Sequence, residues 1–193
     1  MKQSFTNTQM ALIKYWHSLP RRCHDLLPCK SDIILPKLAS IAPNLGMAED
    51  MGVDKLFIRL IGSTVDKNIG KSVQHTNSFD HYEDSAKEWL NAHYRNLFDT
   101  PAGVMHDMTF NFQRKALYVQ KFMHLPLCDE KGICKFLIST FEKSDINLDI
   151  SQHQPRLICV EDFSALRTID IGAGPGQTCH GLQNGQMLDP IKI

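Results

Sequence analysis

The sequence predicts an α+β fold, in which short helices pack on an antiparallel sheet, from three observations. Residues 55–61 alternate apolar side chains on two faces and lead through Gly62 into a short helical turn. Residues 80–97 have the apolar spacing of a longer helix. Residues 116–141 then form two long apolar segments joined by the turn 129–132, which is typical of a β-hairpin.

The composition is that of a globular protein without a charge bias. Lys and Arg together number 21, as do Asp and Glu, so no net positive field predicts binding to nucleic acid or to an anionic membrane. The first residues lack the apolar core of a signal peptide, and no later run reaches membrane-spanning length. We therefore expect a cytoplasmic protein, and we expect its six cysteines to be thiols rather than disulfides.

Two cysteine pairs have a spacing that invites comparison with metal sites. Cys23 and Cys29 flank five residues, and so do Cys128 and Cys134. Zinc knuckles typically use cysteines two to four residues apart. Free thiols are therefore the preferred interpretation, and we assign no metal.

Residues 8–19 are predicted to form an amphipathic helix that Thr8 caps and Pro20 ends. Its apolar face is wide, and consists of Leu12, Ile13, Tyr15, Trp16 and Leu19. Such a face covers a sheet or meets a second subunit. Because it carries more apolar surface than one covering face needs, we expect a homodimer through this helix.

The long helix is predicted to start at Asp80, where Glu83 three residues later completes a capping-box-like arrangement. A first strand is expected within residues 37–47, although Pro43 and Gly46 interrupt its pattern.

Residues 104–112 alternate strictly, and residues 117–127 and 133–141 complete the sheet. Pro126 implies an edge position or a bulge in its strand. From Lys143 onward the pattern loosens, so we divide the chain into a domain over 1–142 and an irregular extension over 143–193 with one or two short strands.

An ordered series of short motifs resembles the single-domain PAS family common in alphaproteobacteria. The motifs are Tyr15-Trp16, Ser31-Asp32 leading to Leu35-Pro36, Phe57 to Thr64, Pro101 to Gly103 and Met123 to Leu127. The resemblance implies a five-stranded antiparallel sheet with helices on one side. It also implies a sensory or regulatory module that binds a small-molecule ligand or a signalling protein and catalyses nothing. Many members of the family have no assigned ligand, and we assign no cofactor.

A pocket is expected between the long helix and the sheet. Its candidate lining residues are Tyr82, Ala86, Trp89 and His93 on the helix, with Phe110, Phe112, Leu117 and Val119 on facing strands. His93 lies where haem-binding PAS domains place an iron ligand, but a hydrogen-bonded core histidine is the preferred interpretation. No Asn-Cys-Arg-Phe run of the flavin photosensors occurs.

Arg59 is a charged residue within an apolar strand. Its planar guanidinium is suited to gripping an anionic ligand, and it is therefore also a candidate pocket residue. A brace to a carboxylate such as Asp66 or Asp32 is the favoured alternative.

Two rival functions follow from the sequence. Residues 168–176 closely resemble the glycine-rich first motif of S-adenosylmethionine-dependent methyltransferases. Residues 177–193 contain Gly181, Gly185 and Pro190 rather than further strand–helix units. The doubly wound sheet of that enzyme needs such units after the motif, so the sequence argues against it. The other rival is a protein-interaction adaptor with a closed core and no ligand.

Overall fold

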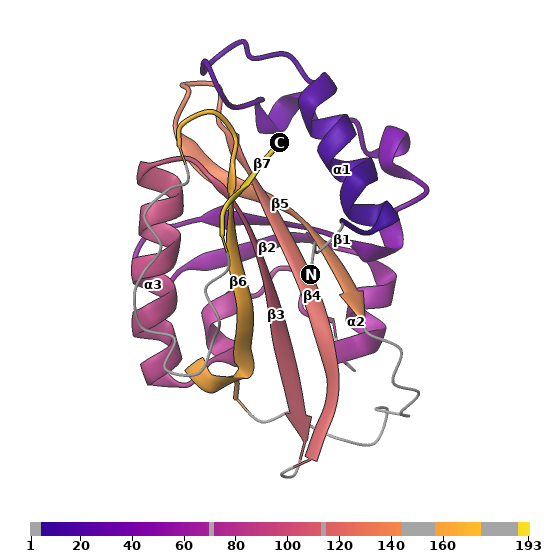
Figure 1. Cartoon of the computed structure of the whole chain (residues 1–193), viewed down its shortest axis with the longest axis vertical. Helices are drawn as coiled ribbons and strands as arrows, with labels where there is room; N and C mark the ends of the chain where they lie inside the picture. The colour runs from indigo at the N-terminus through magenta and orange to yellow at the C-terminus, as the bar shows by residue number, and fades with distance from the viewer. Residues whose placement is uncertain (1–4, 70–71, 113–114, 144–156, 175–188) are drawn as a thin grey trace.

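A single seven-stranded sheet organises the chain, in the order β2-β1-β5-β4-β3-β6-β7 (Figure 1). The computed structural model describes residues 5–69, 72–112, 115–143, 157–174 and 189–193. The strands are β1 (Leu45–Asp50), β2 (Leu56–Ile61), β3 (Gly103–Phe112), β4 (Lys115–Cys128), β5 (Cys134–Lys143), β6 (Phe163–Asp170) and β7 (Ile191–Lys192). The α-helices are α1 (Asn7–Ser18), α2 (Ser63–Ile69) and α3 (Asp84–Asp99), and the 3-10 turns are η1 (Lys30–Asp32), η2 (Leu35–Leu38), η3 (Ala42–Asn44), η4 (Ser78–His81) and η5 (Val160–Asp162).

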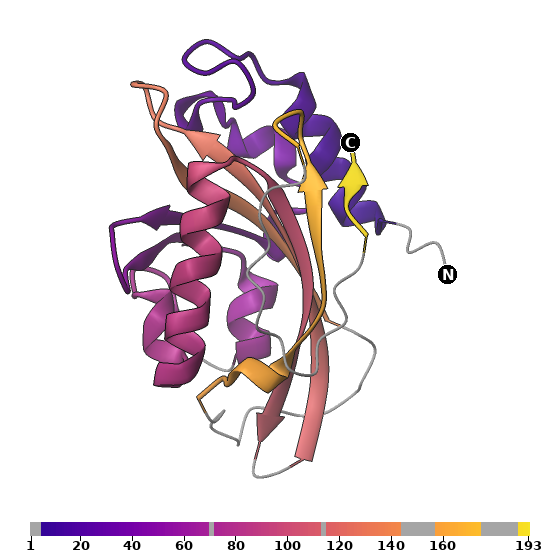
Figure 2. The same cartoon turned by 60° about the vertical axis from the view of Figure 1, so that its left-hand side comes forward.

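The sheet separates two helical layers. In Figure 2, α2 and α3 lie on one face of the sheet and α1 lies on the other. The five strands β2-β1-β5-β4-β3 are contiguous and antiparallel. The predicted α+β fold class is therefore confirmed, with two further strands added beside β3.

Two predicted boundaries are wrong for the same physical reason, because 3-10 turns occupy the segments. Residues 37–44 are not a strand: Pro36 and Pro43 stand at the starts of η2 and η3, where a missing N–H costs nothing, and β1 begins only at Leu45. Asp80 likewise lies in η4, and α3 begins at Asp84 with Glu83 as its N-cap.

Helix α1 is capped by Thr6 rather than by Thr8. The Thr6 hydroxyl accepts from the backbone N–H of Gln9 at 3.1 Å, and the Gln9 side chain accepts from the Thr6 N–H at 3.0 Å, which completes a capping box. Trp16 is 1% exposed, and its indole N–H donates to the carbonyl of Pro126 at 2.9 Å.

The apolar face of α1 is therefore covered within one chain, apart from half-buried Tyr15. The expectation that this face has surplus apolar surface is wrong. The prediction of a homodimer through α1 depended on that surplus, so this helix no longer supports it.

Strand β4 is central, between β5 and β3, so the predicted edge position of Pro126 is wrong. The alternative expectation of a bulge is closer, because the β4–β5 register shifts between Leu127 and Cys128. The proline has no N–H to donate to a neighbouring strand, and its carbonyl accepts the indole N–H of Trp16 on α1.

The segment after residue 143 contributes to the sheet and to the core. Strand β6 pairs antiparallel with β3, and β7 pairs parallel with β6. Phe163 and Leu166 are buried in the core that α3 covers, while Ile169 and Ile171 are buried in the core that α1 covers. The described part of the extension thus adds two strands, β6 and β7, to the same sheet.

The five described cysteines are free thiols. The sulfur atoms of Cys29 and Cys128 lie 3.6 Å apart, and Cys134 is the cross-strand neighbour of Cys128. Burial raises the pKa of the Cys134 thiol to about 12. Within the described residues, no group of three or more His, Cys, Asp or Glu side chains has the arrangement of a metal site, and no helix is long and apolar enough to cross a membrane.

Candidate functional site

A cavity of about 180 Å³ lies between the sheet and the layer formed by α2, η4 and α3. An engineered apolar cavity of roughly 150 Å³ binds benzene, so this space suits a molecule of about one substituted ring. Its apolar walls come from β1, β2, α2 and the segment after α2, and from the cavity-facing side chains of β3, β4 and β5, which we call the floor. They include Ala48, Leu56, Ile58, Leu60, Val65, Val73, Met108, Phe122, Leu137 and Phe141.

The junction of β2 and α2 fixes one side of the cavity. Gly62 donates its N–H to the carbonyl of Leu45 at 2.7 Å and passes directly against the backbone of Ala42 and Pro43. Any side chain at this position would overlap the Pro43 carbonyl. The close approach holds α2 over the end of β1 and turns Val65 towards the cavity.

The sheet floor of the cavity carries polar side chains among the apolar ones. Side chains alternate along a strand, so residues two apart share a face. On β4 this parity places Gln120, Phe122 and His124 on the cavity face, and on β3 and β5 it places His106 and Ser139 beside them.

Two of these polar side chains have unused hydrogen-bonding atoms. Gln120 is fully buried, and neither its Nε2 nor its Oε1 has a partner in the described part of the chain. The Nδ1 of His124 pairs with the Ser139 hydroxyl at 2.6 Å, whereas its Nε2 has no partner among the described residues. Buried polar atoms are nearly always satisfied in folded proteins, so such atoms on a cavity wall require an explanation.

The imidazoles of this layer are neutral at physiological pH. Burial lowers the pKa of His93 to about 4. Burial, together with the neighbouring histidines, lowers the pKa of His124 to about 3 and that of His106 well below its usual value. The rings of His106 and His124 stack at 5.2 Å, so protonating one disfavours protonating the other.

The phenols beside the cavity are likewise uncharged. Burial raises the pKa of Tyr82 to about 12 and raises that of Tyr94 as well. Among the described lining residues there is no Lys or Arg, and the one carboxylate, Asp80, is exposed. The interior of the cavity therefore offers hydrogen bonds without a compensating charge.

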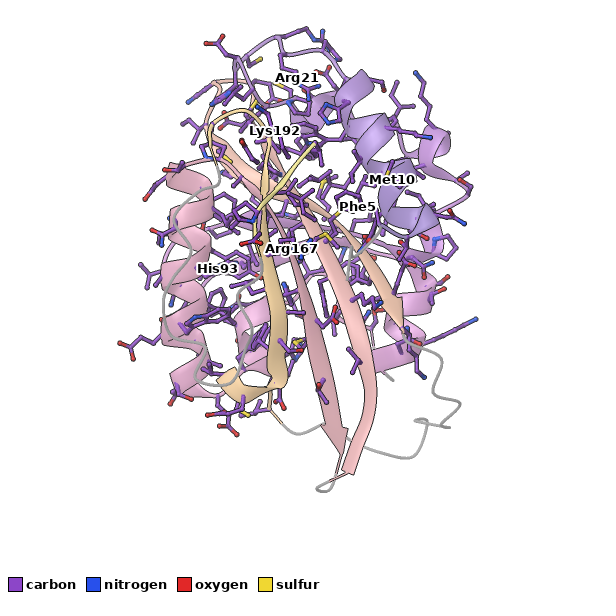
Figure 3. The ribbon with its side chains drawn as sticks, viewed as in Figure 1. Phe5, Met10, Arg21, His93, Arg167 and Lys192 are labelled. Atoms are coloured by element: carbon purple, nitrogen blue, oxygen red, sulfur yellow. The ribbon has the colours of Figure 1, made fainter. Side chains whose placement is uncertain are left out.

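The predicted helix face and the cavity coincide at one residue whose side chain is described, Tyr82. Ala86, Trp89 and His93 are absent from the described lining. Trp89 stacks on His93 at 5.2 Å and packs against Phe163 of β6 at 5.1 Å (His93 is labelled on α3 in Figure 3).

His93 is buried on the sheet side of α3, but the expected hydrogen bond is wrong. It is 3% exposed, and neither ring nitrogen has a partner in the described part of the chain. The displacement of the cavity from this helix face has a physical cause: β6 brings Phe163 against α3, and the aromatic packing closes that space.

The remaining strand candidates divide into two groups. Val119 has the opposite parity to Gln120 and does not line the cavity in the described structure. Phe110, Phe112 and Leu117 occupy positions in β3 and β4, but their side chains lie outside the described residues.

Arg59 forms a surface brace and lies away from the described lining. Its guanidinium contacts the carboxylate of Glu49 at 2.6 Å and lies 4.5 Å from the ring centre of Phe57. The expectation of a carboxylate partner is confirmed, but Asp66 and Asp32 are not the partners. Burial raises the pKa of Glu49, but Lys135 and Arg59 outweigh it and hold the pKa below its usual value.

The glycine-rich segment after β6 forms a turn. The carboxylate of Asp170 accepts the backbone N–H groups of Gly172 and Gly174 at 2.8 and 3.0 Å. Both glycines have positive φ, at 114° and 91°, which other residues rarely adopt. The rest of the motif, from residue 175, lies outside the described residues.

Gln120, His124 and Ser139 were not predicted as site residues, although the sequence contains a signal for them. Each is a polar residue on the buried parity of an otherwise apolar strand. Alternation reveals the face, but a polar side chain on that face equally fits a satisfied core position until its neighbours are known.

The fold and the cavity between its helices and sheet define a class of sensory domain. A family model of the PAS domain matches residues 4–138. The chain therefore belongs to the PAS-domain family. No curated protein sequence matches it.

Proposed function

We propose that this chain is a non-enzymatic sensory module that binds a small molecule in the cavity between β1–β5 and the layer of α2, η4 and α3. One observation supports this most directly. The cavity is lined mainly by apolar residues, yet its floor has buried hydrogen-bonding atoms on Gln120 and His124 that no described residue satisfies. Small-molecule sites have this composition, an apolar enclosure with a few convergent polar groups.

The wall opposite the sheet provides a route from binding to signalling. It includes Val65 on the seven-residue helix α2, Val73 after that helix, and Ser78 in η4. These short elements gain contacts when a ligand fills the cavity. Ligand binding then favours the arrangement of α2 and η4 that closes on it, which is the population shift a sensor requires.

Thermal-shift screening against a metabolite library tests the proposal. Saturable stabilisation by a compound is the expected result. The adaptor hypothesis, with a closed core, predicts no such compound. The methyltransferase hypothesis predicts binding of S-adenosylmethionine, for which we expect a flat calorimetric titration.

A matched pair of substitutions locates the binding site. Ala48 lines the cavity, whereas Ala86 is fully buried on α3 and does not line it in the described structure. Ala48→Phe fills empty space, so it should fold normally and abolish the shift given by any library compound that stabilises the wild type. Ala86→Phe overcrowds a packed helix face and should cost roughly 1–3 kcal/mol of unfolding free energy.

The proposal requires that Ala48→Phe abolish ligand binding and that Ala86→Phe, where it is folded, retain it. Undiminished binding by Ala48→Phe would place the ligand elsewhere. Loss of binding by a folded Ala86→Phe, with Ala48→Phe unaffected, would return the site to the helix face of Ala86, Trp89 and His93.

A further inference from the structure

The polar atoms on the cavity floor restrict what kind of molecule fits the proposed sensory function. Gln120 presents an amide N–H donor and a carbonyl acceptor, both buried and without a partner among the described residues. His124 presents Nε2, which donates or accepts according to the tautomer that its Nδ1 contact with Ser139 selects.

The two groups are the first and the last of the described lining residues on β4. They are four residues apart on β4, with Phe122 between them on the same face. Four residues of antiparallel strand span about 13 Å, and strand side chains stand roughly perpendicular to the sheet. A ligand that reaches both groups therefore lies over the Phe122 ring, and two hydrogen bonds of about 3 Å leave about 7 Å between its polar ends, the length of one ring with a polar substituent at each end.

The middle of the floor suits a flat apolar body. The rings of Phe122 and His106 stack at 4.7 Å, and Phe141 meets Phe122 edge-on at 5.1 Å. Aromatic rings pack favourably in such offset and edge-to-face arrangements.

The electrostatics exclude a charged ligand from this floor. No Lys or Arg is among the described lining residues, and the two imidazoles of the floor, His106 and His124, are too deeply buried to carry a charge at neutral pH. A buried anion or cation without a partner is far more costly than a buried neutral group.

We propose that the cavity binds an uncharged molecule of about one substituted ring, whose polar ends hydrogen-bond with the Gln120 amide and with Nε2 of His124. This inference rests on the proposed function, and it specifies the chemical class of the ligand. The amide of Gln120 is matched by a ligand group that both donates and accepts, such as a carboxamide.

Three probes of similar shape test the class: para-hydroxybenzamide, para-hydroxybenzoate and para-xylene. Calorimetry with the full chain at pH 7 should show saturable binding of the amide. The anionic carboxylate should bind at least about tenfold more weakly, because its charge has no partner.

Gln120→Leu separates a hydrogen bond from mere shape. The variant removes an unsatisfied amide from the core, so its melting temperature should rise. It should weaken binding of para-hydroxybenzamide by about tenfold while leaving or tightening binding of para-xylene. His124→Leu should likewise weaken the amide probe relative to para-xylene.

Thr140→Val is the matched control. Thr140 is fully buried on β5, its hydroxyl has no partner among the described residues, and it is not a described lining residue. Its variant should also raise the melting temperature, but it should leave the affinity for each probe unchanged.

Three outcomes would overturn the inference. One is equal binding of the carboxylate and the amide, and another is equal weakening of the amide and para-xylene by Gln120→Leu. The third is a set of library ligands that are charged or wholly apolar, which would leave the proposed function intact. A library in which no compound raises the melting temperature would contradict the proposed function as well.

Discussion

The two faces of the sheet are built from the same strands but differ in chemistry. The face under α1 is packed mainly with aliphatic residues, methionines and cysteines around Trp16. The face under α2 and α3 is rich in aromatic rings, encloses a cavity, and contains three buried histidines and Gln120. Alternation along a strand lets one sequence specify both faces independently, so one face can be a closed wall while the other encloses a cavity.

The largest expected effect on stability comes from a substitution on the closely packed face under α1. Trp16→Ala removes a side chain that is 1% exposed and leaves the Pro126 carbonyl without its indole donor. We expect a loss of about 3–5 kcal/mol in the free energy of unfolding, measured by urea denaturation.

Trp16→Ala should lower the stability of the fold without changing the cavity on the other face of the sheet. At a temperature where the variant is still folded, its affinity for a library ligand should equal that of the wild type. A loss of less than about 1 kcal/mol would show that the α1 face is far less tightly packed than its burial indicates.

The second expected effect is a pH dependence of the unfolding free energy that arises from the histidines on the cavity side of the sheet. The imidazoles of His93, His106 and His124 are neutral in the folded state because burial lowers their pKa, but they take up protons near pH 6.5 once unfolded. The unfolded chain therefore binds more protons below pH 6.5. Stability is complete above that pH and falls as the pH drops towards 4, by about 1.4 kcal/mol per histidine at pH 5.5.

Comparing urea denaturation at pH 7.5 and pH 5.5 checks the sign and the source. His93→Phe should shrink the difference between the two conditions by about 1.4 kcal/mol. Trp16→Phe, on the other face, should lower stability by the same amount at both values. Equal stability of the wild type at both pH values would contradict the neutral state of the three imidazoles.

The same distinction between local and long-range interactions explains which elements could be predicted from the sequence. The strand over 56–61 and the hairpin after residue 115 were predictable because alternation and turn residues are local signals. The start of α3 was not, because Asp80 fits a helix N-cap as well as a position inside the η4 turn, which Asn77 caps, and tertiary contacts decide between them.

The site shows the same division more sharply. Tyr82 was predicted and does line the cavity, whereas Ala86, Trp89 and His93 were expected there and are not among its described lining residues. Trp89 packs against Phe163 of β6 instead, and His93 stacks on Trp89. Nothing local in residues 86–93 indicates that Phe163, some seventy positions later, fills the space beside them. Long-range packing of this kind cannot be read from periodicity.

The smallest expected effect concerns the surface of β2. Arg59→Ala removes the contact with Glu49, but the Arg59 side chain is 39% exposed and solvent screens the pair. We expect a loss of at most about 1 kcal/mol in unfolding free energy and no change in ligand affinity. Loss of ligand binding by this variant would restore Arg59 as a contact to an anionic ligand and contradict the uncharged class.

Residues 157–163 complete the cavity from outside the segment that the family model matches. The matched segment ends at residue 138, yet Leu157 and Ile158 line the cavity and Phe163 stacks against Tyr82 at 6.0 Å. Part of the enclosure is thus supplied by residues beyond the matched segment. Substitutions confined to residues 157, 158 and 163 would therefore reshape the cavity and its aromatic border while leaving every residue of the matched segment unchanged.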